Sequence, residues 1–215
     1  MITSKLAPRI GPQPEVLATI DRIALRLIDR AKPVRFTSTF GEKELASIYR
    51  QRYETVVERG WARPEDLPSG LEQDEFDPLA LHIAGWDGET LAASARLVFP
   101  TPGLSLPTEQ AFGVQIEPHG QVADLSRQIV ARGYSSSQHA IFSGLLSYCW
   151  LQAQMRGFYY VCGDFTPAMI RLYNRLGLLV NPVGEPRPYW GEERIPIVQD
   201  VLGAASVLAA RYLER

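Results

Sequence analysis

The sequence predicts an α+β fold built on a mixed central β-sheet. Helix-like and strand-like segments follow one another in the order helix, β, α, long loop, β-hairpin, β, α, β, α, β, α. The hairpin is indicated by Asp87-Gly88, which separates the strand-like runs 79–86 and 90–99. A long apolar helix then separates the next strand from later ones, which is typical of a crossover connection. We therefore expect a three-layer arrangement, with helices flanking the sheet.

The first elements are a helix, a strand and a second helix. Val16, Ile20, Ile23 and Leu27 recur at helical spacing and predict an amphipathic helix over residues 14–31. The further expected elements are a strand 34–40, a helix 42–59, a loop 62–78, strands 121–131 and 158–163, helices 137–155 and 166–175, a proline-broken β segment and a closing helix 198–213. This order divides the chain into an N-terminal tail and helical extension (1–33), one main domain (34–200) and a C-terminal helix (201–215).

Composition and charge indicate a globular protein without a nucleic-acid or membrane partner. A chain of 215 residues fits one large domain. Its net charge of −2 gives no electrostatic footprint for nucleic acid or an anionic membrane. We find neither a secretory signal nor an apolar run long enough to span a bilayer, so we expect a soluble, cytoplasmic protein.

The cysteines and histidines do not predict a metal site. Cys149 and Cys162 stand alone in apolar segments and are expected to be buried free thiols. His82, His119 and His139 lie in separate segments without ligand spacing.

Two charged motifs stand where buried or functional structure is expected. Residues 72–77 (Glu-Gln-Asp-Glu-Phe-Asp) hold four carboxylates, and residues 124–127 (Asp-Leu-Ser-Arg) lie inside apolar sequence. Because a buried charge costs several kcal/mol unless it is paired, we expect these groups to find each other and Arg96. Arg96 should lie on the strand next to that of Asp124 and Arg127, within salt-bridge distance of Asp74, Asp77 or Asp124. The alternative for Asp74 and Asp77 is a solvated acidic turn.

These motifs resemble those of the acyl-homoserine-lactone (autoinducer) synthases and the long-chain N-acyl amino acid synthases. Exosortase-associated acyltransferases share the same layout. The matching residues are Arg52, Gly60-Trp61, Glu72, Asp74, Phe76, Asp77, Arg96, Leu97, Pro100, Phe112, Asp124, Ser126 and Arg127. The resemblance runs from about Phe36 to Ile197 and implies an acetyltransferase-like (GNAT) fold. It also implies an N-acyltransferase that moves a fatty acyl group to the amine of a small acceptor, an amino acid or S-adenosylmethionine.

Several departures favour a broad N-acyltransferase over a strict homoserine-lactone synthase of quorum sensing. Asp124 replaces the usual Glu and is one methylene shorter. Val56 and Gln128 stand where the family has aromatic residues near the acceptor pocket, which speaks against S-adenosylmethionine as acceptor. The helix over 14–31 is extra relative to compact autoinducer synthases. A catalytically idle relative that binds acyl carrier protein or lipid is the competing hypothesis.

The resemblance assigns roles to individual residues. Asp124 is the candidate general base, and its alternative is a structural ion pair with Arg127 or Arg96. Arg127 is expected to hold the acidic loop, while Asp74, Asp77 and Arg96 position the acceptor amine. The candidate substrate-binding residues are Arg52, Trp61, Phe76, Phe112, Ser126, Phe142 and Leu146. For Arg52 the alternative is a surface residue lying over aromatic rings, for Trp61 either role predicts burial, and for Phe142 and Leu146 the alternative is plain core.

The acyl donor is inferred from a missing motif. Acetyltransferases that use coenzyme A usually carry R/Q-x-x-G-x-G/A after the central strand, where backbone amides bind the pyrophosphate. Residues 131–137 read Ala-Arg-Gly-Tyr-Ser-Ser-Ser and lack that spacing. We therefore expect an acyl-phosphopantetheine donor on acyl carrier protein rather than on coenzyme A, with no permanently bound cofactor. Arg132, Arg156, Arg171 and Arg175 are candidates for docking the acidic carrier.

Overall fold

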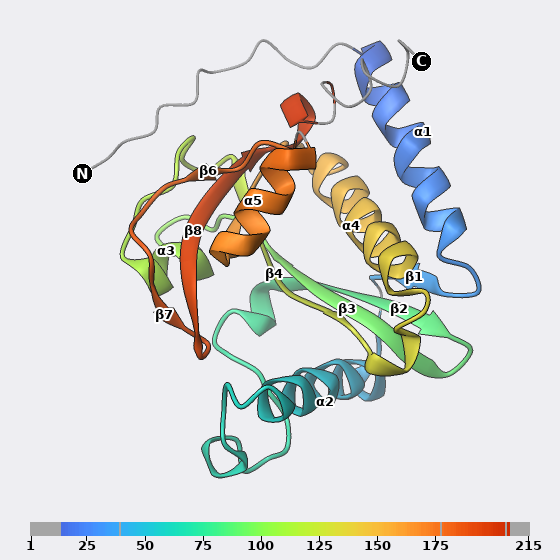
Figure 1. Ribbon diagram of the computed structural model, residues 1–215, viewed down its shortest axis with the longest axis vertical. Helices are drawn as coiled ribbons and strands as arrows, with labels where there is room; N and C mark the ends of the chain where they lie inside the picture. The colour runs from blue at the N-terminus through green and yellow to red at the C-terminus, as the bar shows by residue number, and fades with distance from the viewer. Residues whose placement is uncertain (1–13, 39, 177, 205, 207–215) are drawn as a thin grey trace. The chain divides into compact units, whose positions relative to one another are not determined.

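The computed structural model describes residues 14–38, 40–176, 178–204 and 206, which form two compact units (Figure 1). Of these residues, unit 1 holds those up to Ile23, Val98–Leu125 and those from Ala153 onward. Unit 2 holds Ala24–Leu97 and Ser126–Gln152. The units interleave along the sequence, and the domain boundaries predicted at 33/34 and 200/201 stay a prediction.

The strands form a mixed sheet of eight, in the order β1-β2-β3-β4-β5-β8-β6, with β7 paired to β8. Their bounds are β1 Arg35–Thr37, β2 Ala80–Asp87, β3 Thr90–Val98, β4 Val122–Val130, β5 Tyr160–Phe165, β6 Asn181–Pro182, β7 Arg187–Tyr189 and β8 Glu192–Asp200. β4 and β5 are parallel, whereas β1–β2 and β5–β8 are antiparallel. The α+β class with a mixed sheet and Arg96 on the strand beside that of Asp124 and Arg127 are thus confirmed.

The helices also lie close to their predicted positions. Their bounds are α1 Pro14–Arg30, α2 Glu42–Glu58, α3 Pro107–Phe112, α4 Gln138–Gln154 and α5 Pro167–Leu176. Among the described helices, none has the length and apolar character needed to cross a membrane.

Unit 2 places two helices against its strands, with α2 and α4 on opposite faces (Figure 1). α2 contacts β3 through Gln51, which donates to the carbonyl of Leu91 (3.2 Å) and accepts from Ser94 Oγ (2.7 Å). α4 lies against β1, where the rings of Tyr148 and Phe36 are 6.1 Å apart. The α2 face therefore receives the polar side chains of β3.

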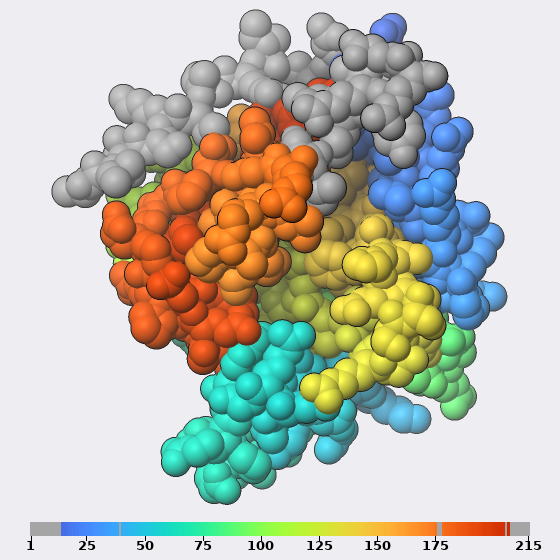
Figure 2. Space-filling model, in the orientation of Figure 1, coloured from blue at the N-terminus to red at the C-terminus, as the bar shows by residue number. Residues whose placement is uncertain are grey.

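A long loop leaves α2 and returns to the sheet at β2. It contains short 3-10 helices at Pro64–Asp66 and Asp77–Leu79. Arg63, Glu65 and Asp66 are exposed, and this part of the loop forms the teal surface of unit 2 (Figure 2). By contrast, Glu72 and Asp77 are buried, so the end of the loop nearest β2 belongs to the interior of the unit.

Unit 1 is built on β5 and β8. β5 pairs with β4 over Tyr160–Cys162, and along its whole length with Ile195–Asp200 of β8. Helix α5 packs here, because Ile170 and Tyr173 contact the buried cluster of Phe165, Val180 and Ile197.

Two predicted elements differ from the structure. The strand predicted over 34–40 is limited to Arg35–Thr37, because only these residues pair with β2, opposite Trp86, Gly85 and Ala84. The helix predicted from Val198 begins only at Val201, since Val198–Asp200 pair with β5 as the end of β8. A short apolar run does not distinguish a buried strand from a buried helix. The rest of that predicted helix, 205 and 207–215, lies outside the described residues.

Candidate active site

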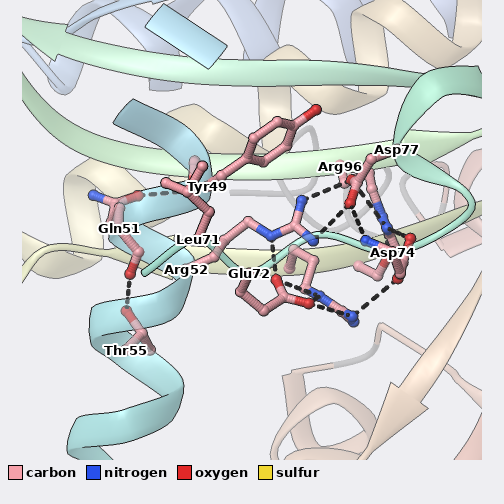
Figure 3. Close-up of polar contacts among 12 residues, drawn as sticks. Tyr49, Gln51, Arg52, Thr55, Leu71, Glu72, Asp74, Asp77 and Arg96 are labelled. Carbon is pink, nitrogen blue, oxygen red and sulfur yellow. Dashed lines mark hydrogen bonds and ion pairs between the residues drawn. The ribbon is translucent and has the colours of Figure 1, made fainter. Parts of the chain in front are cut away.

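The loop residues Glu72–Asp77, here called the acidic loop, lie where three arginines from three elements converge. Two of these arginines, Arg52 and Arg96, are labelled in Figure 3. Arg52 comes from α2, Arg96 from β3 and Arg127 from β4. All of these residues belong to unit 2.

Local hydrogen bonds that involve no arginine shape the acidic loop. The N–H of Glu72 donates to the carbonyl of Tyr49 on α2 (3.0 Å). The N–H of Asp74 donates to Asp77 Oδ2 (2.7 Å), and the N–H of Phe76 donates to Asp74 Oδ1 (3.0 Å). Such side-chain bonds to nearby backbone are the reason Asp is favoured in turns. They hold the carboxylates of Asp74 and Asp77 in one orientation.

Arg52 is the inner cation of the site, with 1% of its surface exposed. Its Nε contacts Glu72 Oε2, and its Nη1 and Nη2 donate to the two oxygens of Asp77 at 2.7 and 3.0 Å (Figure 3). The guanidinium carbon also lies 5.4 Å from the ring centre of Tyr49. The alternative of a surface arginine is wrong, because two carboxylates draw this side chain into the interior.

Arg96 and Arg127 complete the network from the sheet. Arg96 Nη1 donates to Asp74 Oδ1 (2.5 Å) and Asp77 Oδ1 (3.1 Å), which confirms the predicted salt bridges. Arg127 Nη2 donates to Glu72 Oε1 (2.9 Å) and Asp74 Oδ2 (3.1 Å), so it holds the acidic loop as predicted. Arg127 has φ of 55°, a left-handed conformation that is unusual for a side chain other than glycine within a strand. The alternative of a solvated acidic turn is also wrong.

The site balances three carboxylates with three guanidiniums, so it is close to neutral. Burial alone raises the pKa of Asp77, but the hydrogen bonds and charges of Arg52 and Arg96 outweigh it and lower this pKa to about 2. Burial likewise opposes the ionised form of Glu72, and Arg127 and Arg52 bring its pKa below the usual value. Both groups are therefore ionised at neutral pH.

Solvent reaches this network from one side. The side chains of Arg52, Arg96 and Asp77 are 1–2% exposed, whereas those of Asp74 and Arg127 are 22% and 15% exposed. A substrate that approaches the site without unfolding it therefore meets Asp74 and Arg127 first.

His82 on β2 underlies the acidic loop, a role that its place in the sequence did not predict. Its ring is buried, and Nε2 lies 3.2 Å from the carbonyl oxygen of Asp77 and 3.4 Å from the hydroxyl of Tyr49. The available signal was a polar ring inside an otherwise apolar strand-like run. Its spacing from the other histidines does not suit a metal site, and a single polar residue in a strand does not show which loop will pack on it.

Asp124, the candidate base, is fully buried in unit 1. Its Oδ2 accepts hydrogen bonds from the backbone N–H (2.8 Å) and the hydroxyl (2.5 Å) of Thr108, at the start of α3. The thiol of Cys162 lies 3.6 Å from the same oxygen. Burial, together with the charge of Asp124, raises the pKa of Cys162, so this thiol stays protonated. Thr108 and Cys162 carry no sequence signal, because strand pairing and α3 bring them to Asp124.

The remaining predicted residues are found in both units. In unit 2, Ser126 Oγ accepts from Arg96 Nε (3.2 Å), and Phe76, Phe142 and Leu146 are half-buried. Trp61 is half-buried rather than buried, because it follows the end of α2 with the guanidinium of Arg59 4.7 Å from its ring centre.

Phe112 and the two cysteines are buried. In unit 1, Phe112 packs edge-on against Tyr189 at 5.4 Å between ring centres. Cys149 and Cys162 are buried free thiols, as predicted. Across the part of the chain that the structure describes, no cluster of His, Cys, Asp and Glu is suited to a metal ion.

Unit 1 also carries an open pocket of about 490 Å³ along residues 100–122. Apolar side chains, including Leu106, Ile116 and Val122, make up much of its lining. Its carboxylate, Glu109, is already engaged, because its two oxygens accept the N–H groups of Leu106 and Ile116 at 2.9 Å each. The pocket therefore suits a hydrocarbon group better than a charged one.

Replacing Arg52 with Met should test the inner ion pairs. The variant leaves Glu72 and Asp77 buried with fewer compensating charges, and we expect the free energy of unfolding to fall by about 3–5 kcal/mol. Urea denaturation at pH 7 measures it. Arg63→Met is the matched control, because Arg63 also pairs with an aspartate, Asp66, but on the exposed part of the loop. Equal midpoints for the two variants would contradict the buried network as a source of stability.

Comparison with known proteins gives one family and several structural relatives. The model of the family described as N-acyl amino acid synthase FeeM matches residues 47–198, a span that includes all six charged residues of the network and Asp124. No curated protein matches the chain. The matched span runs from α2 into β8, so it takes in both units.

Solved structures show the fold. FeeM, an N-acyl amino acid synthase from uncultured soil microbes, is 18% identical over 82% of this chain and 97% of that one, with a TM-score of 0.63. BjaI, a CoA-dependent acyl-homoserine lactone synthase, is 19% identical over 83% and 88%, with a TM-score of 0.64. An acyl-CoA N-acyltransferase from Pseudomonas aeruginosa is 18% identical over 77% and 99%, with a TM-score of 0.52. The predicted GNAT-like fold is thus confirmed.

Proposed function

Because the chain belongs to the FeeM family of N-acyl amino acid synthases and is an N-acyltransferase, we propose that it joins a fatty acyl group to the amine of a free amino acid. The observation that supports this acceptor is the exposed edge of the charge network. Asp74 and Arg127 stand there side by side, 3.1 Å apart. A carboxylate and a guanidinium next to each other complement the ammonium and the carboxylate of a zwitterionic amino acid.

The reaction needs positioning and the removal of a proton from the acceptor. The deprotonated amine attacks the thioester carbonyl carbon, the carbon–sulfur bond breaks, and the thiol leaves with a proton. Asp74 and Arg127 contact the acceptor in this proposal. Asp77 and Arg96 position Asp74 from the interior, and Arg52 fixes the orientation of Asp77. Asp124 is the proposed general base, and Thr108 fixes the orientation of its carboxylate.

The proposed donor is an acyl chain on acyl carrier protein. In the turn after β4 (residues 131–137), where a coenzyme A cradle is expected, four of the seven backbone N–H groups are already engaged. Those of Ala131, Tyr134, Ser135 and Ser137 donate to the carbonyls of Ala92, Ala131, Arg132 and Tyr134. Few amides of this turn are left for a pyrophosphate, so a phosphopantetheine arm carried by a protein fits better. The half-buried side chains of Phe142 and Leu146 on α4 are the proposed acyl-chain contacts.

The direct test is product formation from purified components. The protein is incubated with acyl carrier protein thioester and with a panel of amino acids, with S-adenosylmethionine as a separate arm. We expect free thiol release that depends on an amino acid, and a product mass equal to the N-acyl amino acid. A lactone product from S-adenosylmethionine would reassign the acceptor. No thiol release with any amine would favour the idle binding relative.

Asp124→Asn should remove the basic site but keep the shape of the side chain. The amide oxygen still accepts both hydrogen bonds from Thr108, so the fold and donor binding should persist. We expect kcat to fall by roughly 100-fold or more, the usual contribution of a positioned base. Near-normal turnover by a variant with unchanged thermal unfolding would leave Asp124 a structural residue.

Carrier protein should exceed the matching acyl-coenzyme A in kcat/KM, and its advantage should shrink as ionic strength rises. The carrier is acidic, and Arg171 and Arg175 lie exposed on α5, where salt screens their attraction. Reversing both charges to Glu should lower the carrier kcat/KM, with the double reversal of Arg26 and Arg30, exposed on α1, as a control of equal charge change. Equal use of both donors at low salt, or a ratio independent of salt, would count against the carrier.

A further inference from the structure

We propose that His82 is a positioning residue that fixes the Asp77 end of the acidic loop and makes acceptor binding fail on acidification. The inference rests on the proposed function only in giving the acidic loop to the acceptor. His82 belongs to none of the family motifs, and it lies behind the network rather than at the exposed edge formed by Asp74 and Arg127.

The tautomer of His82 follows from its partner. Nε2 lies 3.2 Å from the carbonyl oxygen of Asp77, which only accepts, and 3.4 Å from the hydroxyl of Tyr49, which can accept or donate, so a proton on Nε2 suits both contacts. Nε2 therefore carries the proton and Nδ1 carries a lone pair. The bond fixes the backbone of Asp77, whose carboxylate receives Arg52, Arg96 and the N–H of Asp74.

Helix α2 holds the other end of the acidic loop, at Glu72. Tyr49 accepts the N–H of Glu72 on its backbone carbonyl (3.0 Å) and packs its ring edge-on against His82, with 5.4 Å between ring centres. His82 and Tyr49 thus fix the backbone at both ends of the acidic loop, at Asp77 and at Glu72. The arginines act on side chains that this backbone has already placed.

Nδ1 of His82 is buried and has no hydrogen-bond partner within the described residues. Buried polar atoms are nearly always paired, so an unpaired one needs an explanation. The hydrogen bond to Asp77 does not by itself require a histidine, because a glutamine amide at position 82 would donate the same bond. What histidine adds is a second nitrogen that can take up a proton near neutral pH.

Protonation of His82 is unfavourable in these surroundings. The titratable and charged groups that face its ring are Tyr49 and Arg52 on α2, Asp77 in the loop and Arg96 on β3. Burial lowers the pKa of His82 most, the two guanidiniums lower it further, and Asp77 opposes both without reversing them. The ring is neutral at pH 7. A proton on Nδ1 would have no acceptor and would add a third cation beside Arg52 and Arg96.

Acidification removes the contribution of His82 to the stability of the folded protein. The pKa of His82 is lower in the folded protein than its usual 6.5, so the unfolded chain takes up the proton first. The contribution of His82 to stability is complete above pH 6.5 and is lost as the pH falls through the folded pKa. Acceptor binding should weaken over the same interval, because the loop loses its anchor at Asp77.

Two substitutions separate positioning from simple packing. In His82→Gln the amide nitrogen occupies the place of Nε2 and can donate to Asp77, whereas in His82→Asn it occupies the place of Nδ1 and cannot. We expect the acceptor KM to rise about 10-fold in His82→Asn, the loss of roughly one buried hydrogen bond, and to be largely retained in His82→Gln. The donor KM should stay unchanged in both.

The pH profile tests what is specific to histidine. From pH 7.5 to 5.5 the wild-type acceptor KM should rise more steeply than that of His82→Gln. Protonation of the acceptor amine affects both proteins equally and cancels in their ratio. Parallel profiles would overturn the acid-sensitive role.

If the variants fold poorly, a measurement on the unaltered protein still tests the inference. Nitrogen NMR of the imidazole rings should show His82 as the neutral Nε2–H tautomer, titrating below pH 6.5. The other two histidines, His119 and His139, provide the comparison in the same spectra. A Nδ1–H tautomer, or titration above 6.5, would overturn the inference. So would equal acceptor KM values in folded His82→Asn and His82→Gln. If no amino acid is acylated, the NMR result still tests the role of His82 independently of the proposed function.

Discussion

The carboxylate of Asp77, shared between two buried arginines, is the interaction on which the rest of the candidate site depends. Arg52 from α2 and Arg96 from β3 both donate to Asp77 Oδ1, so one side chain ties a helix to a strand through a loop. Removing any member leaves a charge of the opposite sign in an apolar interior, which costs more than the pair contributes. The network therefore constrains the residues around it more strongly than its net contribution to stability suggests.

This constraint explains why a long loop is ordered at its functional end. Loops of this length inside a domain are usually mobile or functional. Here Glu72 and Asp77 are buried, while Arg63 and Asp66 of the same loop are exposed and paired only with each other. An acceptor site needs fixed charges, because ordering a mobile carboxylate on binding reduces the net binding free energy. The backbone bonds from Tyr49 and His82 supply that order without using the carboxylates themselves.

Arg127, whose backbone is left-handed, connects strand β4 to the acidic loop. A regular strand directs residues three apart to opposite faces, so Asp124 and Arg127 would point away from each other along a regular β4. The backbone at Arg127 has φ of 55° and so departs from strand geometry, and its guanidinium reaches Glu72 and Asp74. Asp124, by contrast, is held by Thr108 and lies against the Cys162 thiol. One short motif thus supplies a residue to each of two polar clusters.

The sequence by itself determined the element order, the mixed sheet, and the carboxylates and two of the three arginines of the charge network. Hydrophobic periodicity, and charges placed within apolar runs, can both be recognised from the order of residues alone. It also placed Arg96 beside the carboxylates, since charges inside apolar runs must find partners. Only the tertiary structure decided that Arg52 is buried, that Val198–Asp200 are strand, and that His82, Tyr49, Thr108 and Cys162 join the polar clusters. The polar partners of these residues lie 5 to 38 positions away in the chain, from His82 with Asp77 to Cys162 with Asp124. A local pattern carries no information about such contacts, because the partner is chosen by the fold rather than by the neighbours in sequence.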